Sequence, residues 1–147
     1  MKLRITTLLL ILGFVIAIPA THAEESSKKE KTELEKTMYV MSKANRQLKK
    51  QISDESKNAS SLELVAKIRD SAEAAVKLIP AKAKDLPEGE RAEFTAKYEA
   101  SMKAFLETVT KLENDLKAND NDSAKKDLAK LGSEQKEGHK NFRKEEE

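Results

Sequence analysis

Apolar residues recur with the period of an α-helix in four segments of this chain. In each segment they follow one another mostly at spacings of three and four, which places them on one face of a helix. The four patterns cover residues 34–52, 62–79, 94–116 and 124–142. Because the positions between them are largely polar, each segment is expected to form an amphipathic helix that buries one narrow stripe.

Short polar motifs indicate where these helices begin. Thr32 and Glu35 have the spacing of a capping box, in which each side chain accepts a hydrogen bond from the backbone N–H of the other residue, so a helix is predicted to start near residue 33. Ser60 and Glu63 repeat this spacing before the second pattern. Ser123 follows an Asn/Asp-rich turn and is predicted to cap the fourth helix.

The segments between the patterns favour one arrangement of the helices. Residues 53–60 and 119–122 are short and rich in Ser, Asp and Asn, which is typical of turns. Pro80 ends the second helix because proline cannot continue the hydrogen-bond ladder, and Pro87 suits the first position of the third. Four amphipathic helices with short connections predict an all-α fold, an up-down-up-down antiparallel four-helix bundle.

Two of the four stripes carry polar residues among the apolar ones. The stripe of the first helix is expected to comprise Leu34, Met38, Met41, Asn45, Leu48 and Ile52. The stripe of the fourth is expected to comprise Ala124, Leu128, Leu131, Gln135, His139 and Phe142. The second stripe runs to Ile79, and the third contains Phe94, Tyr98, Met102 and Phe105. Asn45, Gln135 and His139 are therefore predicted to face the interior of the bundle.

The first 23 residues have a different character. A short basic head precedes an apolar run over residues 5–18, and small residues follow up to Ala23. This order is typical of a secretory signal peptide, so cleavage after Ala23 is predicted to leave residues 24–147 as one domain. The apolar run is short for a transmembrane helix, and an uncleaved anchor is the alternative. An exported chain without cysteine fits the periplasm of a Gram-negative bacterium.

Cleavage would leave a chain without net charge. Lys2 and Arg4 belong to the predicted signal peptide, so 26 of the 28 basic residues remain against 26 acidic ones. This balance gives no reason to expect a nucleic-acid partner, and no later segment is apolar enough to place the mature chain in a membrane. Charged residues make up 37% of the sequence and aromatic residues 4%, which favours long helices with narrow apolar contacts.

His139 is the only histidine outside the predicted signal peptide, which contains His22. One imidazole cannot form a zinc site or a proton relay, but it can be one of two axial ligands of a haem iron. In an up-down-up-down bundle the start of the first helix and the end of the fourth share one end, so Met38 and His139 are predicted to meet there. Without a Cys-x-x-Cys-His motif, the haem would be held non-covalently.

These residues also have simpler interpretations. A methionine on a helical stripe commonly fills a core. A histidine near the end of a helix is commonly exposed, where its charge is favourable to the helix dipole. Met41 and Met102 are rival thioether ligands, so the choice of Met38 depends on its height along the first helix.

Both ends of the helical region resemble the soluble cytochrome b562 family. Residues 34–38 are similar to the start of the family's first helix, with its methionine ligand at Met38, and residues 139–143 are similar to its closing stretch, with its histidine ligand at His139. The resemblance covers residues 33–143. This chain departs from the family at Gly138 and Gln135, where members often have an aromatic residue and an arginine.

The resemblance implies a periplasmic b-type haem protein, with one non-covalent haem b per chain ligated by Met38 and His139. It implies that Tyr98 and Met102 form part of the haem wall, that there are no catalytic residues, and that redox proteins of the periplasm are partners. The alternatives are a haem buffer without a redox partner and a haem-free helical interaction or adaptor protein of the periplasm.

Overall fold

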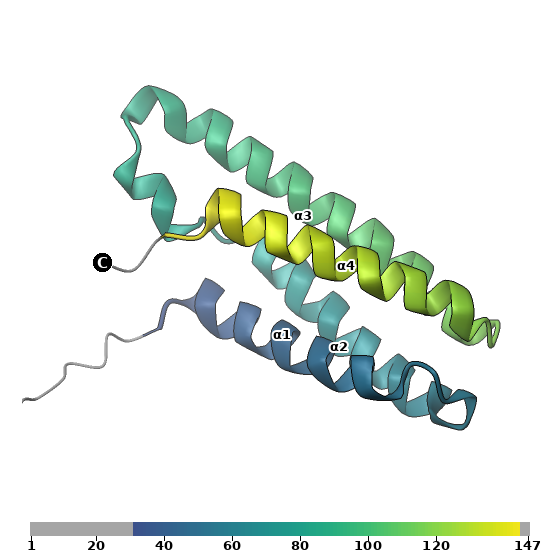
Figure 1. The fold of residues 1–147 in the computed structure, drawn as a ribbon. Coiled ribbons are helices and arrows are strands. Elements are labelled where there is room, and N and C mark those ends of the chain that lie inside the picture. Colours follow the sequence, from purple (N-terminus) through teal and green to yellow (C-terminus); the bar gives the residue numbers. More distant parts are fainter. Residues whose placement is uncertain (1–30, 145–147) are drawn as a thin grey trace, which may run out of the picture.

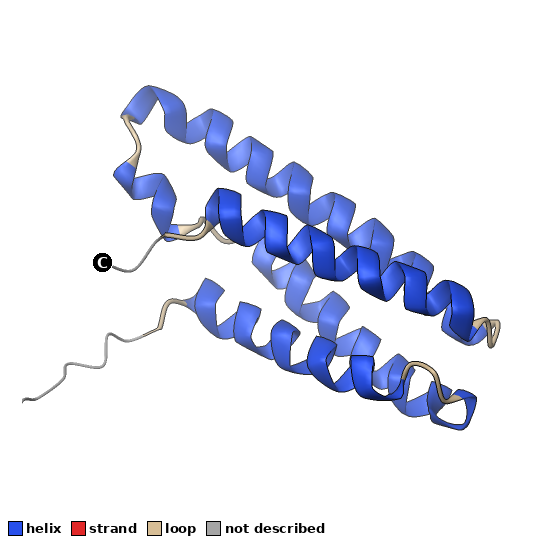
Figure 2. Cartoon of the chain, in the orientation of Figure 1, coloured by secondary structure: helices blue, strands red, loops and turns tan. Residues whose placement is uncertain are grey.

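The computed structural model describes residues 31–144, which form four α-helices and two short 3-10 helices (Figures 1 and 2). The α-helices are α1 (Glu33–Gln51), α2 (Asn58–Val76), α3 (Glu88–Lys117) and α4 (Asn121–Phe142), and the 3-10 helices are η1 (Glu55–Lys57) and η2 (Ala81–Asp85). Within this part of the chain, every helix is too short or too polar to span a bilayer. The predicted signal peptide and its cleavage site lie outside the described residues.

Each helix packs against its neighbours in the sequence. The pairs α1–α2, α2–α3 and α3–α4 lie in close contact, whereas α1 and α4 have few close backbone contacts. Figure 1 shows that successive helices run in alternate directions, so the start of α1 and the end of α4 lie at the same end of the bundle. We call this the termini end, and we call the opposite end, which holds the α1–α2 and α3–α4 connections, the loop end. The predicted four-helix bundle is confirmed.

The starts of the first two long helices follow local capping chemistry. The capping box formed by Thr32 and Glu35 is present at α1, as predicted. The capping box predicted at Ser60 is wrong, because α2 already begins at Asn58. Asp54 instead caps η1, which continues directly into α2, so the helical turn starts several residues earlier than expected.

Two other boundaries also differ from the sequence prediction. α4 begins at Asn121, and the Asp120 side chain accepts the hydrogen bond from the backbone N–H of Ser123, so Ser123 is not the cap. α2 ends at Val76. Ile79 therefore lies beyond the helix and is 64% exposed instead of buried on its stripe.

The apolar core runs along the bundle and becomes looser towards the termini end. Its largest fully buried apolar side chains are Leu48, Ile68, Leu112, Leu116 and Leu131. The apolar residues nearest the termini end on α1 and α4 are Leu34, Met38 and Phe142, and all three are only partly buried. On α1 and α4, the core thus excludes water less completely in the last turn at the termini end than it does towards the loop end.

Three asparagines close the loop end. Asn121 donates one hydrogen bond to the carbonyl of Ile52 at the end of α1 (2.7 Å) and one to Oδ1 of Asn58 at the start of α2 (2.9 Å). Asn58 donates in turn to Oδ1 of Asn119 and of Asn121. Asn119 adopts a positive φ of 58°, a conformation that asparagine tolerates better than most residues. These bonds join the α1–α2 hairpin to the α3–α4 hairpin.

The asparagine cluster predicts a stability effect. Asn121→Ala should lower the free energy of unfolding by about 1–3 kcal/mol, because it leaves the carbonyl of Ile52 and Oδ1 of Asn58 without a donor. Urea unfolding followed by circular dichroism measures the change. Asn114→Ala removes an exposed asparagine on α3 and is the matched control. Equal midpoints for the two variants would show that the cluster does not stabilise the fold.

Candidate functional site

The line along which α1 and α4 face each other, here called the seam, is joined by few contacts. Beyond the loop end, Asn45 Nδ2 donates a hydrogen bond to Gln135 Oε1 (3.3 Å). One turn nearer the loop end, a Cβ added at Gly132 would lie 3.5 Å from Lys49 Nζ. Among residues 31–144, no hydrogen bond or ion pair joins the two helices between Asn45–Gln135 and the termini end. Polar contacts therefore hold the seam at its loop end and middle only.

These two contacts fix the register of the two antiparallel helices. Met38 lies seven residues before Asn45, or ~10 Å along the axis, and His139 lies four residues after Gln135, or ~6 Å. Both residues are therefore on the termini side of the hydrogen bond, within about one helical turn of each other in height. Spacings of three, four and seven keep residues on one row of a helix, so His139 continues the row of Gly132 and Gln135 that faces α1.

Met38 lies at the edge of the core. Its side chain is partly buried and packs against the core cluster. The rival thioethers are deeper, since Met41 is 4% exposed and Met102 on α3 is 8% exposed. Of the three, Met38 is the one nearest the termini end on a helix that borders the seam.

His139 is exposed, so the prediction that it lies on the inward stripe is wrong. The inward stripe of α4 continues from Leu131 and Gln135 to Gly138 and Phe142, which are partly buried, and His139 lies on the flank that faces α1. Nearby atoms still remove part of its hydration. This burial lowers the pKa of the His139 imidazole below its ordinary 6.5, and the Arg143 cation lowers the pKa further.

Gly138 leaves the inward stripe without a side chain at the height of His139. A Cβ added at this glycine would meet no atom within 4 Å, so there is open space beside the helix backbone. Every other position of this stripe from Ala124 to Phe142 carries a side chain. Gly138 lies four residues after Glu134, which accepts a hydrogen bond from Thr108 of α3, so the open space is beside the α4 backbone on the side of this stripe nearer α3.

Aromatic side chains pack behind this space. Phe142 makes edge-to-face contacts with Phe94 (ring centroids 5.5 Å apart) and with Tyr98 (5.4 Å). The Tyr98 hydroxyl donates a hydrogen bond to the carbonyl of Ala75 on α2 (2.8 Å), and burial raises the pKa of Tyr98 to about 12. The end of α4 is thereby packed against α3 and, through Tyr98, against α2.

The η2 connection holds the last turn of α4 from the other side. Lys82 Nζ donates a hydrogen bond to the carbonyl of Asn141 (3.0 Å), and Lys144 Nζ forms an ion pair with Asp85 (2.9 Å). Both contacts lie within five residues of His139. A lysine that donates to one of the last carbonyls also compensates the negative end of the helix dipole.

One buried polar atom marks the inner limit of the open part of the seam. Asn45 is 4% exposed, and its Oδ1 has no hydrogen-bond partner within the described structure. A buried acceptor without a donor is uncommon. It separates the apolar core at the loop end from the looser region that contains Met38 and His139.

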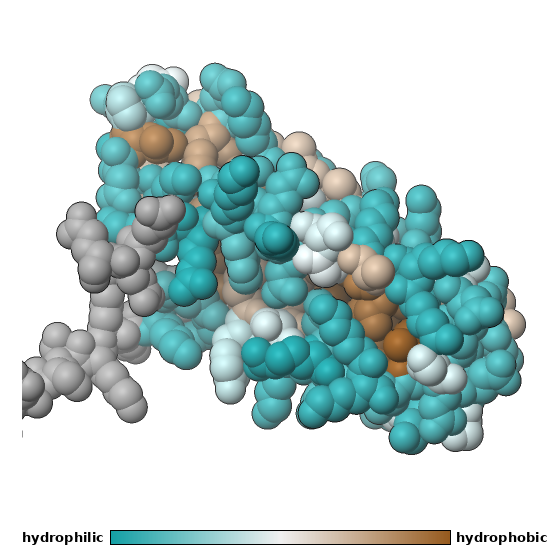
Figure 3. Space-filling model, viewed as in Figure 1, coloured by the Kyte–Doolittle hydropathy of each residue, from teal (hydrophilic) through white to brown (hydrophobic). Residues whose placement is uncertain are grey.

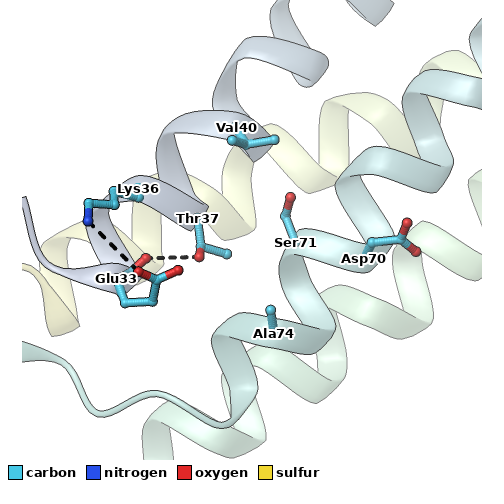
Figure 4. A pocket seen from close by; sticks show the side chains of 7 residues that line it. All are labelled: Glu33, Lys36, Thr37, Val40, Asp70, Ser71 and Ala74. Carbon is cyan, nitrogen blue, oxygen red and sulfur yellow. Dashed lines mark hydrogen bonds and ion pairs between the residues drawn. The ribbon is translucent and has the colours of Figure 1, made fainter.

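The groove shown in Figure 4 is a different feature. It runs along the α1–α2 contact and is lined by Glu33, Lys36, Thr37, Val40, Asp70, Ser71 and Ala74. These α1 residues lie on the flank opposite the seam, and none of the four predicted site residues lines the groove. It is open to solvent and brings together only two acidic side chains, which are too few to indicate a metal site.

The structure brings the predicted site residues to one region without joining them all. Met38 and His139 lie on facing flanks of α1 and α4, while Tyr98 and Met102 are buried in the core on α3. The hydrophobic pattern of the sequence places Phe142 only on its stripe and does not indicate the open space at Gly138. The continuation of the spacing of three and four through residue 138 was the signal that would have indicated both.

Comparison with known proteins gives one family. The family model described as cytochrome b562 matches residues 33–143, which is most of the chain. Neither the curated proteins nor the solved structures give a significant match.

The environment of His139 predicts its titration in the haem-free protein. In a chain that begins at Glu24, His139 is the sole histidine, and its NMR titration midpoint should lie below 6.5. Arg143→Gln should raise the midpoint, because it removes one of the two causes of the shift. Because folding lowers this pKa, protonation of His139 should reduce stability as the pH falls below 6.5. A midpoint at or above 6.5 would contradict the placement of the ring.

Burial of Tyr98 predicts a change at high pH. Its ionisation, followed by ultraviolet absorbance, should have a midpoint near 12 and should be absent from Tyr98→Phe. Because folding raises this pKa from 10, the contribution to stability is present below pH 10 and is lost between pH 10 and 12. Tyr39→Phe changes an exposed ring and should keep the high-pH phase. Loss of that phase in Tyr39→Phe alone would contradict the assignment.

Proposed function

Since this chain belongs to the cytochrome b562 family, a family of haem-binding electron carriers, we propose that it binds one non-covalent haem b at the termini end of the seam. Met38 and His139 are the proposed axial ligands. Tyr98 and Met102 are proposed to form part of the wall behind the haem. The observation that carries the proposal is the placement of these two donors on facing flanks of α1 and α4, where the helices are not joined.

The residues of the seam fit a haem in three respects. The open space at Gly138 gives room for a ring edge beside the α4 backbone. Met38 is partly buried and His139 is exposed, so both can reorient towards a ligand without breaking a hydrogen bond of their own side chains. Behind them, Phe94, Tyr98 and Phe142 provide an aromatic surface that excludes water.

The donor set favours electron transfer over catalysis. A bound haem supplies a reversible one-electron change at its iron. The thioether of Met38 is a soft ligand that favours the reduced iron, and the neutral imidazole of His139 is the second ligand. If Met38 and His139 both held the iron, no open position would be left for a substrate. The lowered pKa of His139 extends towards lower pH the range in which the imidazole is neutral and able to coordinate.

The proposed place of this function is the periplasm. The support is the order of basic head, apolar run and small residues before Ala23, together with the absence of cysteine from the sequence. A haem buffer would use the same ligands but would have no redox partner. A haem-free interaction protein is the second candidate, and the exposure of His139 is the observation that favours it.

Haem titration tests the ligand assignment. The purified protein mixed with haem and reduced should give the absorption spectrum of low-spin, six-coordinate iron. Met38→Ala and His139→Ala should each abolish this spectrum. Each should also weaken haem binding by at least about 10–100-fold, because the loss of a residue that only supports a ligand already costs that much. Met41→Ala is the matched control, one turn deeper on the same helix, and should keep the spectrum.

Two outcomes would contradict the proposal. An unchanged spectrum in both Met38→Ala and His139→Ala would reject these ligands, and no haem binding by the unmodified protein would favour the haem-free alternative.

Haem affinity should also fall in acid, because only neutral imidazole coordinates iron. Rapid electron exchange with an exported oxidase or cytochrome separates a carrier from a buffer.

A further inference from the structure

Four cationic side chains border the seam on its solvent side. Arg46 and Lys49 lie on α1, and Lys136 and Arg143 lie on α4. Lys49 reaches across to Gly132, which places its ammonium at the seam. Arg46 lies one turn from Lys49 on the same flank. We call these four residues the basic rim.

The two α4 members are placed by their neighbours. Lys136 lies four residues after Gly132 and three before His139, so it shares the flank of α4 that faces α1. Arg143 lies four residues after His139, and its charge contributes to the lowered pKa of that imidazole. The basic rim therefore follows the seam from its middle to the termini end.

The charges of the basic rim are not compensated within residues 31–144. All four residues are exposed, and none forms an ion pair there, whereas Lys97, Lys117 and Lys144 each pair with a carboxylate. The acidic residue on the same flank of α1 is Glu35, and its carboxylate accepts the backbone N–H of Thr32 (2.7 Å) in the capping box. Figure 3 shows this face, with hydrophilic side chains around apolar atoms that are visible between α1 and α4.

The overall charge makes this local excess informative. The full chain has a formal net charge of +2, and the predicted mature chain has none. A protein with so little net charge has no general attraction for anions. The four cations of the basic rim lie along one line without a carboxylate partner among residues 31–144, so they give this face a local attraction for anions.

We infer that the seam face is the docking surface for an acidic patch on a redox partner protein. The inference rests on the proposed function, because electrons would leave through the side of the bundle where α1 and α4 are not joined. Complementary charge accelerates the encounter and orients the two proteins, which suits a short-lived electron-transfer complex with a small interface. Binding of a nucleic acid is disfavoured, because four cations are fewer than the 6–10 phosphate contacts typical of such proteins.

The first experiment needs no haem. The purified haem-free protein, labelled with ¹⁵N, is mixed at low salt with poly-glutamate as the probe for an acidic protein surface. Backbone amide shifts should concentrate at the four rim residues and disappear at about 1 M salt, where the Debye length is about 3 Å. Shifts spread evenly over the surface, or no shifts, would overturn the inference. Tighter binding of phosphatidylglycerol vesicles or single-stranded DNA at the same residues would overturn the choice of a protein partner.

The second experiment uses the haem-bound protein. Its oxidation by anionic hexacyanoferrate(III) should slow as salt increases, although the net charge is close to zero. Arg46→Glu combined with Lys136→Glu should lower the low-salt rate by about tenfold, the lower end of electrostatic steering effects. Lys103→Glu combined with Lys111→Glu makes the same charge change on α3, at exposed residues away from the seam, and should have a much smaller effect.

The controls separate failure of the docking surface from failure of the proposed function. Equal rate losses in the two double variants would show that only net charge matters, and would overturn the inference. If the protein does not bind haem but the poly-glutamate shifts map to the basic rim, the anion-binding surface stands while the electron-carrier function fails. If haem binds but neither experiment detects the basic rim, the haem-binding function stands while the docking surface fails.

Discussion

The contacts that hold α1 to α4 determine where this bundle can accept a ligand. Asn121 joins the two helices at the loop end through the carbonyl of Ile52, and Asn45 joins Gln135 near the middle. Beyond that hydrogen bond, Leu34, Met38 and Phe142 are only partly buried, and α1 and α4 have no direct polar contact within the described chain. A bundle of four long helices would otherwise close along its full length, because apolar stripes favour burial.

The same arrangement explains how donors far apart in sequence can share one site. Of the four pairs of neighbouring helices around the bundle, three pack closely, so α2 and α3 form the well-packed side and the seam lies opposite. Phe142 fixes the end of α4 to Phe94 and Tyr98 on this well-packed side. The proposed ligands therefore lie on the helices that are less firmly joined to each other, while the wall behind them is well packed.

Sequence periodicity predicted the helices and most of the core. It was less reliable where two nearby residues could each cap a helix or continue an apolar stripe. Ser123 was a reasonable cap, yet the carboxylate of Asp120 is three residues earlier and accepts the Ser123 N–H instead. On α4 the stripe can continue from Gln135 by a step of three or of four. Glycine at 138 carries no apolar signal, so the pattern favoured His139, which the structure places on the flank. The contacts that set the seam could not be predicted, because hydrogen bonds between side chains 90 residues apart leave no local pattern.

The hydrogen bond from Lys82 to the carbonyl of Asn141 and the Asp85–Lys144 ion pair connect η2 to the last turn of α4. A connection of this kind is usually the part of a bundle most tolerant of insertion and deletion. Here its length is coupled to the position of the chain end that it holds. Relatives that lengthen or shorten this connection would consequently need a compensating change after residue 140. Circular permutants opened within residues 81–85 would lose the contacts that hold the last turn of α4, while the asparagines at the loop end would keep theirs.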